Sequence, residues 1–272
     1  MNYINQALVY INQSLNYINQ TLVYRLSLRK RFFSPFHTTF LVGYTTFMMH
    51  LEEIPPGQPQ RPTPAAHPPQ LLETLCLLHR VPQRVEQHRV RMAAALSAMN
   101  APSRRALSAL DGPLVELLRD APPPTADRER LRLVYDGVGH YTWTLHPYTP
   151  RPVRTLRLFA ADQLDYAHKW ADRRALDACF AARAGADDVL LVRHGRLTDT
   201  TIANVALWDG HHWCTPAEPL LRGTHRAHLL ERGLIVERDL TPADLARCLR
   251  LRLFNAMLAW GEIDLPISAV LL

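Results

Sequence analysis

Apolar positions along the chain recur at two spacings, which predict alternating helices and strands. Apolar residues recur at helical spacing in residues 84–99 and 103–119. Residues 131–135, 140–146 and 153–160 are instead typical of strands, and proline runs at 122–124 and 150–152 separate the segments. Ordered structure is expected to begin near Leu71.

The C-terminal half continues this alternation. The pattern predicts a helix over 173–184, a strand over 188–193, a turn at His194-Gly195, and a strand over 203–208. Asp209-Gly210 is a hairpin signal, after which Trp213 begins the return strand. A helix over 224–232 is expected between Gly223 and Gly233, followed by strand 234–238, helix 241–248 and an apolar segment over 251–260. The pattern predicts an α/β fold with mixed sheets and hairpins, divided into subdomains 71–152 and 153–272.

The first 70 residues are expected to lie outside this fold. Residues 2–22 contain NYINQAL, VYINQSL and NYINQTL, whose apolar positions are spaced by four and three as in a coiled coil. The near-identical heptads carry no complementary charges, which favours a translated tandem repeat, with Met48 or Met49 as an alternative start. Residues 54–70 are proline-rich and predict an extended linker.

Charge and cysteine content narrow the class of protein. The net charge is +6, but residues 1–48 contribute four basic residues and no acid, so the remaining chain has 27 basic and 25 acidic residues. This balance gives no reason to expect a nucleic acid or a membrane surface as partner. No apolar run reaches membrane-spanning length, and no secretory signal is recognised at the start. Four scattered cysteines without a C-x-x-C pair favour reduced thiols in a cytoplasmic protein.

Lysine is almost absent from the chain. Its 31 basic residues comprise 29 arginines and only Lys30 and Lys169. Arginine stays protonated in proteins, whereas a lysine amine can lose its proton and act as a nucleophile. A lysine retained in such a composition is a candidate for chemistry that arginine cannot perform.

Four spaced segments carry a specific resemblance. They are DYAHKWADR at 165–173, GRLTDTTIAN at 195–204, LLRGTHR at 220–226 and LFNAM at 253–257. In this order they resemble the class IV aminotransferases, the fold-type IV pyridoxal phosphate enzymes, over roughly residues 71–265. That family includes branched-chain and D-amino acid aminotransferases and aminodeoxychorismate lyases. The resemblance implies a two-subdomain, D-amino acid aminotransferase-like fold that binds pyridoxal 5'-phosphate.

The resemblance also implies roles for particular residues. Lys169 would form the Schiff base with the cofactor and move the α-proton of the substrate. Asp199 stands where the family commonly has a glutamate under the pyridine nitrogen. The helix start at Gly223, Thr224 and His225 would bind the cofactor phosphate through its free amides.

Two further segments complete the implied site. Asn255 and Ala256 would touch the phosphate and offer backbone amides to a substrate carboxylate. Arg91, in a His-x-x-Arg pattern that begins at His88, would hold the phosphate. Glu73-Thr74 is similar to an ET stretch near the start of the family, although the glycines usual before it are missing. No metal site is predicted, because the candidate ligands lack zinc-finger spacing: His211, His212, Cys214, His225 and His228.

Three functions remain open from the sequence. The leading hypothesis is an aminotransferase acting on a small-molecule amino acid/keto acid pair, and the resemblance implies a homodimer. An aminodeoxychorismate-type lyase would share the same residues. Lyases of that type commonly carry arginines after the strand matching 131–135, where this chain has Asp136–His140. The third is a non-catalytic family member that serves as a binding module.

Overall fold

A computed structural model describes residues 68–101, 108–120 and 124–271. All of them belong to one compact unit, His67–Leu272. The predictions for the heptad repeat, for the linker up to residue 67 and for the start of the predicted helix 103–119 fall outside the described residues.

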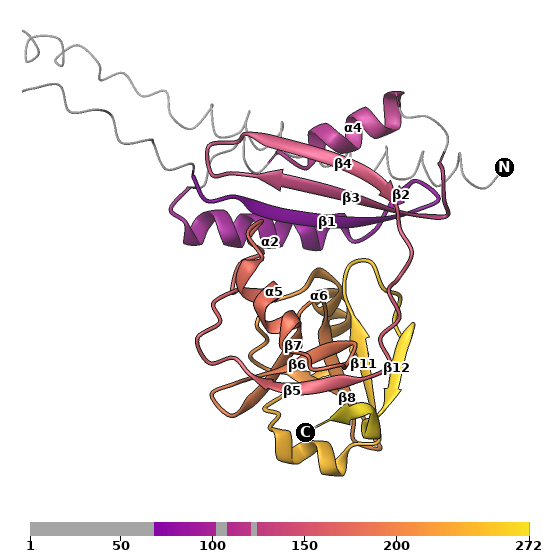
Figure 1. Ribbon diagram of the computed structural model, residues 1–272. Helices are drawn as coiled ribbons and strands as arrows, with labels where there is room; N and C mark the ends of the chain where they lie inside the picture. Colours follow the sequence, from indigo (N-terminus) through magenta and orange to yellow (C-terminus); the bar gives the residue numbers. More distant parts are fainter. Residues whose placement is uncertain (1–67, 102–107, 121–123, 272) are drawn as a thin grey trace, which may run out of the picture. The chain divides into compact units, whose positions relative to one another are not determined.

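The described residues of the first half of this unit form a four-stranded antiparallel sheet and two helices (Figure 1). The strand order is β2-β1-β3-β4, formed by β1 (Leu71–Leu78), β2 (Val81–Pro82), β3 (Arg128–Tyr135) and β4 (Tyr141–Pro147). Helices α2 (Val85–Ala98) and α4 (Asp111–Asp120) contribute apolar residues to the core beside the sheet. Buried and half-buried residues alternate strictly along β3, so that Arg128, Arg130 and Arg132 share the face away from this core.

The second half is built on a nine-stranded mixed sheet. Its path runs β10-β9-β8-β7-β6-β5-β13, with β11 paired to β8 and β12 paired to β11. The strands are β5 (Leu156–Ala160), β6 (Asp188–Arg193), β7 (Arg196–Thr200), β8 (Asn204–Trp208), β9 (Trp213–Pro216), β10 (Val236–Arg238), β11 (Arg250–Phe254), β12 (Ile263–Pro266) and β13 (Val270–Leu271). Helices α5 (Arg174–Ala181) and α6 (Thr224–Glu231) belong to this half.

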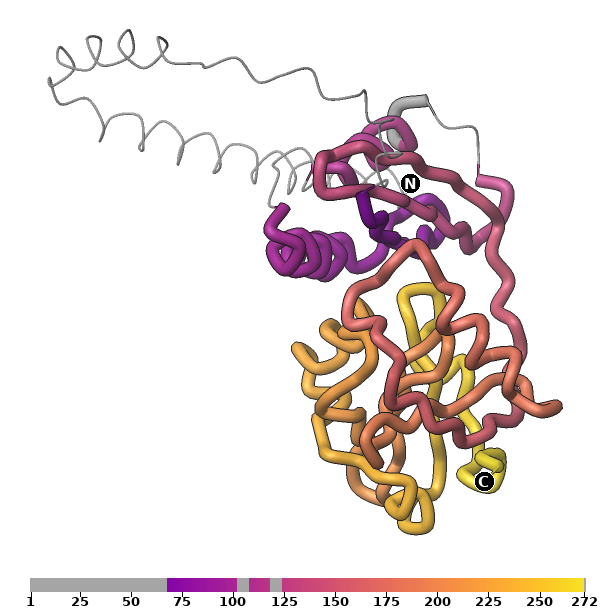
Figure 2. The backbone as a smooth tube through the Cα atoms, turned by 60° about the vertical axis from the view of Figure 1, so that its left-hand side comes forward, coloured from indigo at the N-terminus to yellow at the C-terminus, as the bar shows by residue number. Residues whose placement is uncertain are grey.

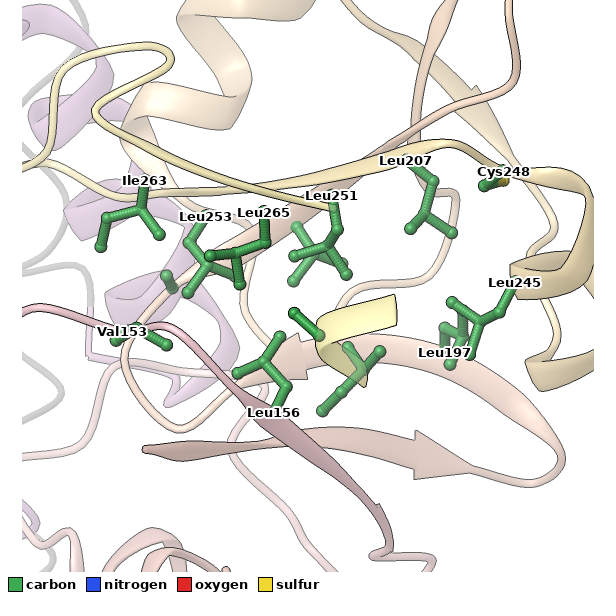
Figure 3. Packing of buried hydrophobic residues seen from close by; sticks show 14 of the residues in the cluster. Val153, Leu156, Leu197, Leu207, Leu245, Cys248, Leu251, Leu253, Ile263 and Leu265 are labelled. Carbon is green, nitrogen blue, oxygen red and sulfur yellow. The ribbon is translucent and has the colours of Figure 1, made fainter. Parts of the chain in front are cut away.

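An aliphatic core holds the second half together (Figure 3). Leu156 of β5, Leu197 of β7, Leu207 of β8 and Leu251 of β11 are at most 1% exposed. Each buried leucine contributes about 1.5–3 kcal/mol through the hydrophobic effect. This packing fixes the strand ends and connecting turns that carry the polar residues discussed below.

The two halves contact each other through helices and backbone. Helix α2 packs against α6. The first residues of β1 meet the segment at 169–171, where Leu72 N donates to Lys169 O at 2.8 Å and Ala171 N donates to Gln70 O at 2.9 Å. Figure 2 traces the single connection from the first sheet into β5.

The predicted elements are largely confirmed. Strand β6 has the predicted bounds, the turn at His194-Gly195 joins β6 to β7, and the predicted helix 84–99 is α2. The predicted helix at 241–248 was wrong in type, because Pro242–Arg247 form a 3-10 helix. Only Leu245 is buried in that short segment, so little packing is available to stabilise further α-helical turns.

Candidate active site

A cavity of about 610 Å³ is lined by residues of both halves. It brings together seven of the eight predicted site residues, which are Arg91, Lys169, Asp199, Gly223, Thr224, Asn255 and Ala256. They come from α2, the segment before α5, β7, the start of α6 and the turn after β11. The eighth, His225, does not line the cavity.

Lys169 is held by its backbone and is half-buried. The carbonyl of Lys169 accepts from Leu72 N. The next residue, Trp170, is fixed as well, because the Tyr166 hydroxyl donates to Trp170 O at 2.6 Å. Burial lowers the pKa of the Lys169 amine to about 7, and the positive charge of Arg91 adds to this effect although Glu73 opposes it. An amine with this pKa is uncharged in a large fraction of molecules at neutral pH and can act as a nucleophile or base.

Asp199 is a buried carboxyl group on β7, with 4% of the residue exposed. Its Oδ1 accepts from Asn204 Nδ2 and its Oδ2 accepts from Leu221 N, both at 2.8 Å. Burial raises the pKa of Asp199 to about 7, although these two hydrogen bonds favour the ionised form. Asn204 begins β8, orients Asp199, and also lines the cavity.

The N-terminus of α6 opens onto the cavity. Gly223 is its extended N-cap residue, and Gly223 and Thr224 line the cavity wall. A Cβ at Gly223 would overlap Asn204 Oδ1, so the close approach of these two segments requires glycine. The first amides of a helix lack internal partners, which makes this end suited to an anion.

A buried network connects the two halves beside the cavity. Glu73 of β1 accepts from Arg91 Nε at 2.9 Å and from His88 Nδ1 at 2.5 Å, and His88 Nε2 lies 3.4 Å from the Thr224 hydroxyl. Burial alone would raise the pKa of Glu73, but Arg91 and His88 together lower it to about 2. With Glu73 ionised, His88 Nδ1 donates and its Nε2 accepts from Thr224. This network orients Arg91 and links it to the start of α6.

In the turn after β11, the side chains of Asn255 and His225 bind other protein groups, whereas the resemblance implied that these residues bind the phosphate. The Asn255 side chain is occupied by the protein, since Nδ2 donates to Ile202 O at 3.0 Å and Oδ1 accepts from Met257 N at 2.8 Å. His225 points to this turn, where its Nδ1 donates to Asn255 O at 2.9 Å. Burial lowers the pKa of His225 to about 4, so this imidazole is neutral at physiological pH.

A set of arginines lies in the cavity wall. Arg173, which the resemblance places near the active site, lines the cavity, and so do Arg130 and Arg132 of β3 and Arg151, which were not predicted from the sequence. Arg151 contacts Asp188 at 3.0 Å, and Arg173 donates to Thr201 O at 2.9 Å. Among the described residues, neither Arg130 nor Arg132 lies within 4.0 Å of a carboxylate. The alternation Arg128-Glu129-Arg130-Leu131-Arg132 was a visible signal that these arginines share one face of a strand.

The described part of the chain contains neither a cluster of metal ligands nor a membrane-crossing helix. No group of three or more metal-capable side chains occurs there. No helix there is both long and apolar enough to cross a bilayer.

The chain matches a protein-family model and is similar to several known proteins. The model of the family "Amino-transferase class IV" matches residues 70–264. An uncharacterized protein of Haemophilus influenzae is 29% identical over 188 residues, which cover 69% of this chain and 97% of that protein. A crystal structure from Haemophilus somnus, described as "a putative 4-amino-4-deoxychorismate lyase", is 28% identical and has a TM-score of 0.62, covering 70% of this chain and 96% of that one. A "hypothetical aminotransferase" of Mycobacterium tuberculosis in "PLP-bound form" shares the fold at 22% identity, with a TM-score of 0.57 and coverage of 74% and 81%.

Proposed function

Because the chain belongs to the class IV aminotransferase family, whose members bind pyridoxal phosphate, we propose that it is a pyridoxal phosphate-dependent aminotransferase acting through Lys169. The single observation that carries this proposal is the shared cavity of the Lys169 amine, the Asp199 carboxyl group and the α6 N-terminus. Its substrates would be an amino acid and a keto acid.

The residues present fit this cofactor. Lys169 offers an amine for its aldehyde, while Arg91 and the first amides of α6, including that of Thr224, offer donors and positive charge for its phosphate. Asp199 offers a carboxyl group for the pyridine nitrogen, and a cationic nitrogen there would favour the ionised form of Asp199. Because Gly223 has no Cβ, the Asn204 side chain has room to lie beside this carboxyl group.

Each protein group then has a defined task. When bound, pyridoxal phosphate supplies an electron sink for the electron pair left at the substrate Cα. The neutral Lys169 amine removes the Cα proton and later returns it at another atom, because its lowered pKa permits both steps near pH 7. The cavity arginines bind the carboxylate of the substrate and orient its Cα toward Lys169.

A lyase of the aminodeoxychorismate type is the second candidate. It is favoured by the likeness to the Haemophilus somnus structure and by Arg130 and Arg132, which line the cavity without a carboxylate partner among the described residues. Two such arginines suit a substrate with more than one carboxylate.

Product analysis separates the candidates. The purified protein is loaded with pyridoxal phosphate and assayed with amino acid/keto acid pairs and with an aminodeoxychorismate. We expect a new amino acid and a new keto acid. Release of pyruvate together with an aromatic amine would identify a lyase instead. Neither product, from protein that carries the cofactor, would favour a non-catalytic binding module.

The two lysines of the chain provide a matched pair of variants for this assay. Lys169→Ala is expected to abolish turnover, because it removes the amine from the cavity. Lys30→Ala is the control and should retain full activity. Substantial residual turnover in Lys169→Ala would contradict the proposed mechanism.

We also propose that the protein is a homodimer, which the family resemblance implies. Light scattering of the purified protein should give twice the 31.0 kDa chain mass. A single-chain mass at micromolar concentration would be the opposing result.

A further inference from the structure

Three consecutive backbone carbonyls in the turn after β11 are bound by side chains from three distant elements. His225 of α6 donates to Asn255 O at 2.9 Å. Arg84, the N-cap residue of α2, donates to Ala256 O at 2.6 Å, and Arg128 of β3 donates to Met257 O at 3.2 Å. Arg84 and Arg128 thus reach from the first half of the molecule into a turn of the second half.

The position of Arg84 is energetically unfavourable for its backbone and for its charge. Its backbone is left-handed, with φ 54° and ψ 37°, a conformation that non-glycine residues rarely adopt. Its Nε is buried without an acceptor, and no carboxylate lies within 4.0 Å of its guanidinium among the described residues. A half-buried guanidinium that donates to one neutral carbonyl and has no nearby carboxylate destabilises the folded state. This favours a functional reason for the position of Arg84.

Arg128 is fixed in a different way. Its NH1 lies 2.8 Å and 2.9 Å from the two carboxylate oxygens of Glu262, which follows the same turn. The turn is therefore contacted by two guanidinium groups of residues that do not line the cavity, while Asn255, Ala256 and Met257 do line it.

These contacts orient the peptide units of the turn. A trans peptide directs its N–H opposite to its C=O, and no cis peptide occurs in the described residues. The Met257 and Leu258 amides are taken by Asn255 Oδ1. The Ala256 amide points away from His225 and has no acceptor among the described residues, which leaves it available as a donor.

We propose that Arg84 and Arg128 are positioning residues that fix the turn at 255–257 from the first half of the molecule, so that the Ala256 amide binds an anionic oxygen of the ligand. This inference rests on the proposed function, under which the anionic oxygen belongs to the cofactor phosphate or to the substrate carboxylate. It makes anion affinity depend on contact between the two halves of the molecule.

The test measures the binding of two anions to the Arg84→Met variant. The phosphate arm compares pyridoxal phosphate with pyridoxal, and the carboxylate arm measures pentanoate binding to the cofactor-loaded protein. We expect affinity to fall about 10-fold or more in at least one arm, the size of a lost hydrogen bond to a charged group, with pyridoxal affinity within about twofold of wild type. The arm that responds identifies which anion the turn holds.

Two further variants test whether the effect depends on the charge and the location of Arg84. Arg84→Lys keeps the charge and should recover part of the lost affinity. Arg183→Met is the matched control, because Arg183 also donates to a backbone carbonyl, Phe180 O at 3.1 Å, but outside the cavity; it should bind both anions as wild type does.

Wild-type affinity for both anions in folded Arg84→Met would overturn the proposal. If Arg84→Met does not fold, Arg128→Met is measured in its place and judged by the same two outcomes.

Failure of the proposed function can be told apart from failure of this inference. If the wild-type protein binds no pyridoxal phosphate, the Ala256 amide signal in ¹⁵N–¹H spectra is followed during titration with inorganic phosphate and with pentanoate. A shift in wild type that requires about 10-fold more anion in the Arg84 variant supports the positioning role. No shift in wild type overturns it.

Discussion

The environments of two residues bring the pKa of an amine and of a carboxyl group to nearly the same value. Burial lowers the pKa of Lys169 to about 7 and raises that of Asp199 to about 7. In water these groups would both be charged at neutral pH. In the cavity, each can gain or lose its proton near pH 7, which suits proton transfer.

The pH dependence of cofactor capture tests the Lys169 environment. Only the neutral amine attacks an aldehyde, so the capture rate should rise with pH through about 7 and level off above pH 8. Nα-acetyl-lysine, with an ordinary pKa, should continue to gain rate toward pH 10. Absorbance of the bound cofactor gives the rate, and a protein profile parallel to that of the free amine would contradict this account.

The contact between Gly223 and Asn204 gives a second test. A Cβ at position 223 would overlap Asn204 Oδ1, so Gly223→Ala should reduce the free energy of unfolding by roughly 1–3 kcal/mol. It should also disturb Asp199, which Asn204 orients. Urea denaturation measures the loss. The double variant Gly223→Ala/Asn204→Ala should recover part of it, and additive losses would show that the overlap is not the cause.

Sequence could predict the chemistry of single residues better than their orientation. Lys169 and Asp199 were predicted because they lie in two of the four spaced segments that resemble the family. Both line the cavity. His225 occupies the predicted helix start but turns to Asn255 O, which depends on a turn 30 positions away in the sequence. Arg130 was missed because the strand was predicted only from residue 131, and Arg132 because the sequence pattern did not show which face of that strand meets the cavity.

At the level of elements, β1 and α2 are connected by a buried ion pair rather than by packing alone. Glu73, 1% exposed, is the carboxylate shared by Arg91 and His88. Glu73→Gln removes the charge that compensates Arg91 and should cost about 3–5 kcal/mol of unfolding free energy.

The loss in Glu73→Gln should depend on pH with a definite sign. The folded-state pKa of Glu73, about 2, lies below the value of about 4.5 expected when unfolded, so its stabilisation is complete above pH 4.5 and is lost as pH falls toward 2. The difference in unfolding free energy between wild type and variant should therefore shrink over that range. A difference that stays constant from pH 7 to pH 3 would show that the charge of Glu73 is not its cause.

Elements with a clear period were predicted, as were the apolar runs of β6 and β8, whereas β1 and β7 were not. Strand β3 alternates between core and cavity faces, and α2 has helical spacing. Strands β1 and β7 are buried on both faces over most of their length, so no polar/apolar alternation marks them in the sequence.

At the level of the whole molecule, a ligand in the cavity contacts both halves at once. A ligand that binds only the folded state stabilises it by about 2.7 kcal/mol at 100 times its Kd. Pyridoxal phosphate should therefore raise the Tm of the 67–272 unit by ~5–10 °C, in one cooperative transition. Calorimetry measures the shift. The Tm of Lys169→Ala should rise clearly less. An equal rise in Tm in both proteins would show that cofactor binding does not depend on Lys169.

The most direct test of the central claim is to find where the cofactor is attached. The protein is mixed with pyridoxal phosphate, reduced with borohydride, digested, and its peptides are identified by mass spectrometry. The account predicts one stoichiometric label, on Lys169, at neutral pH. A label on Lys30 or on the N-terminal amine, with Lys169 unmodified, would contradict it.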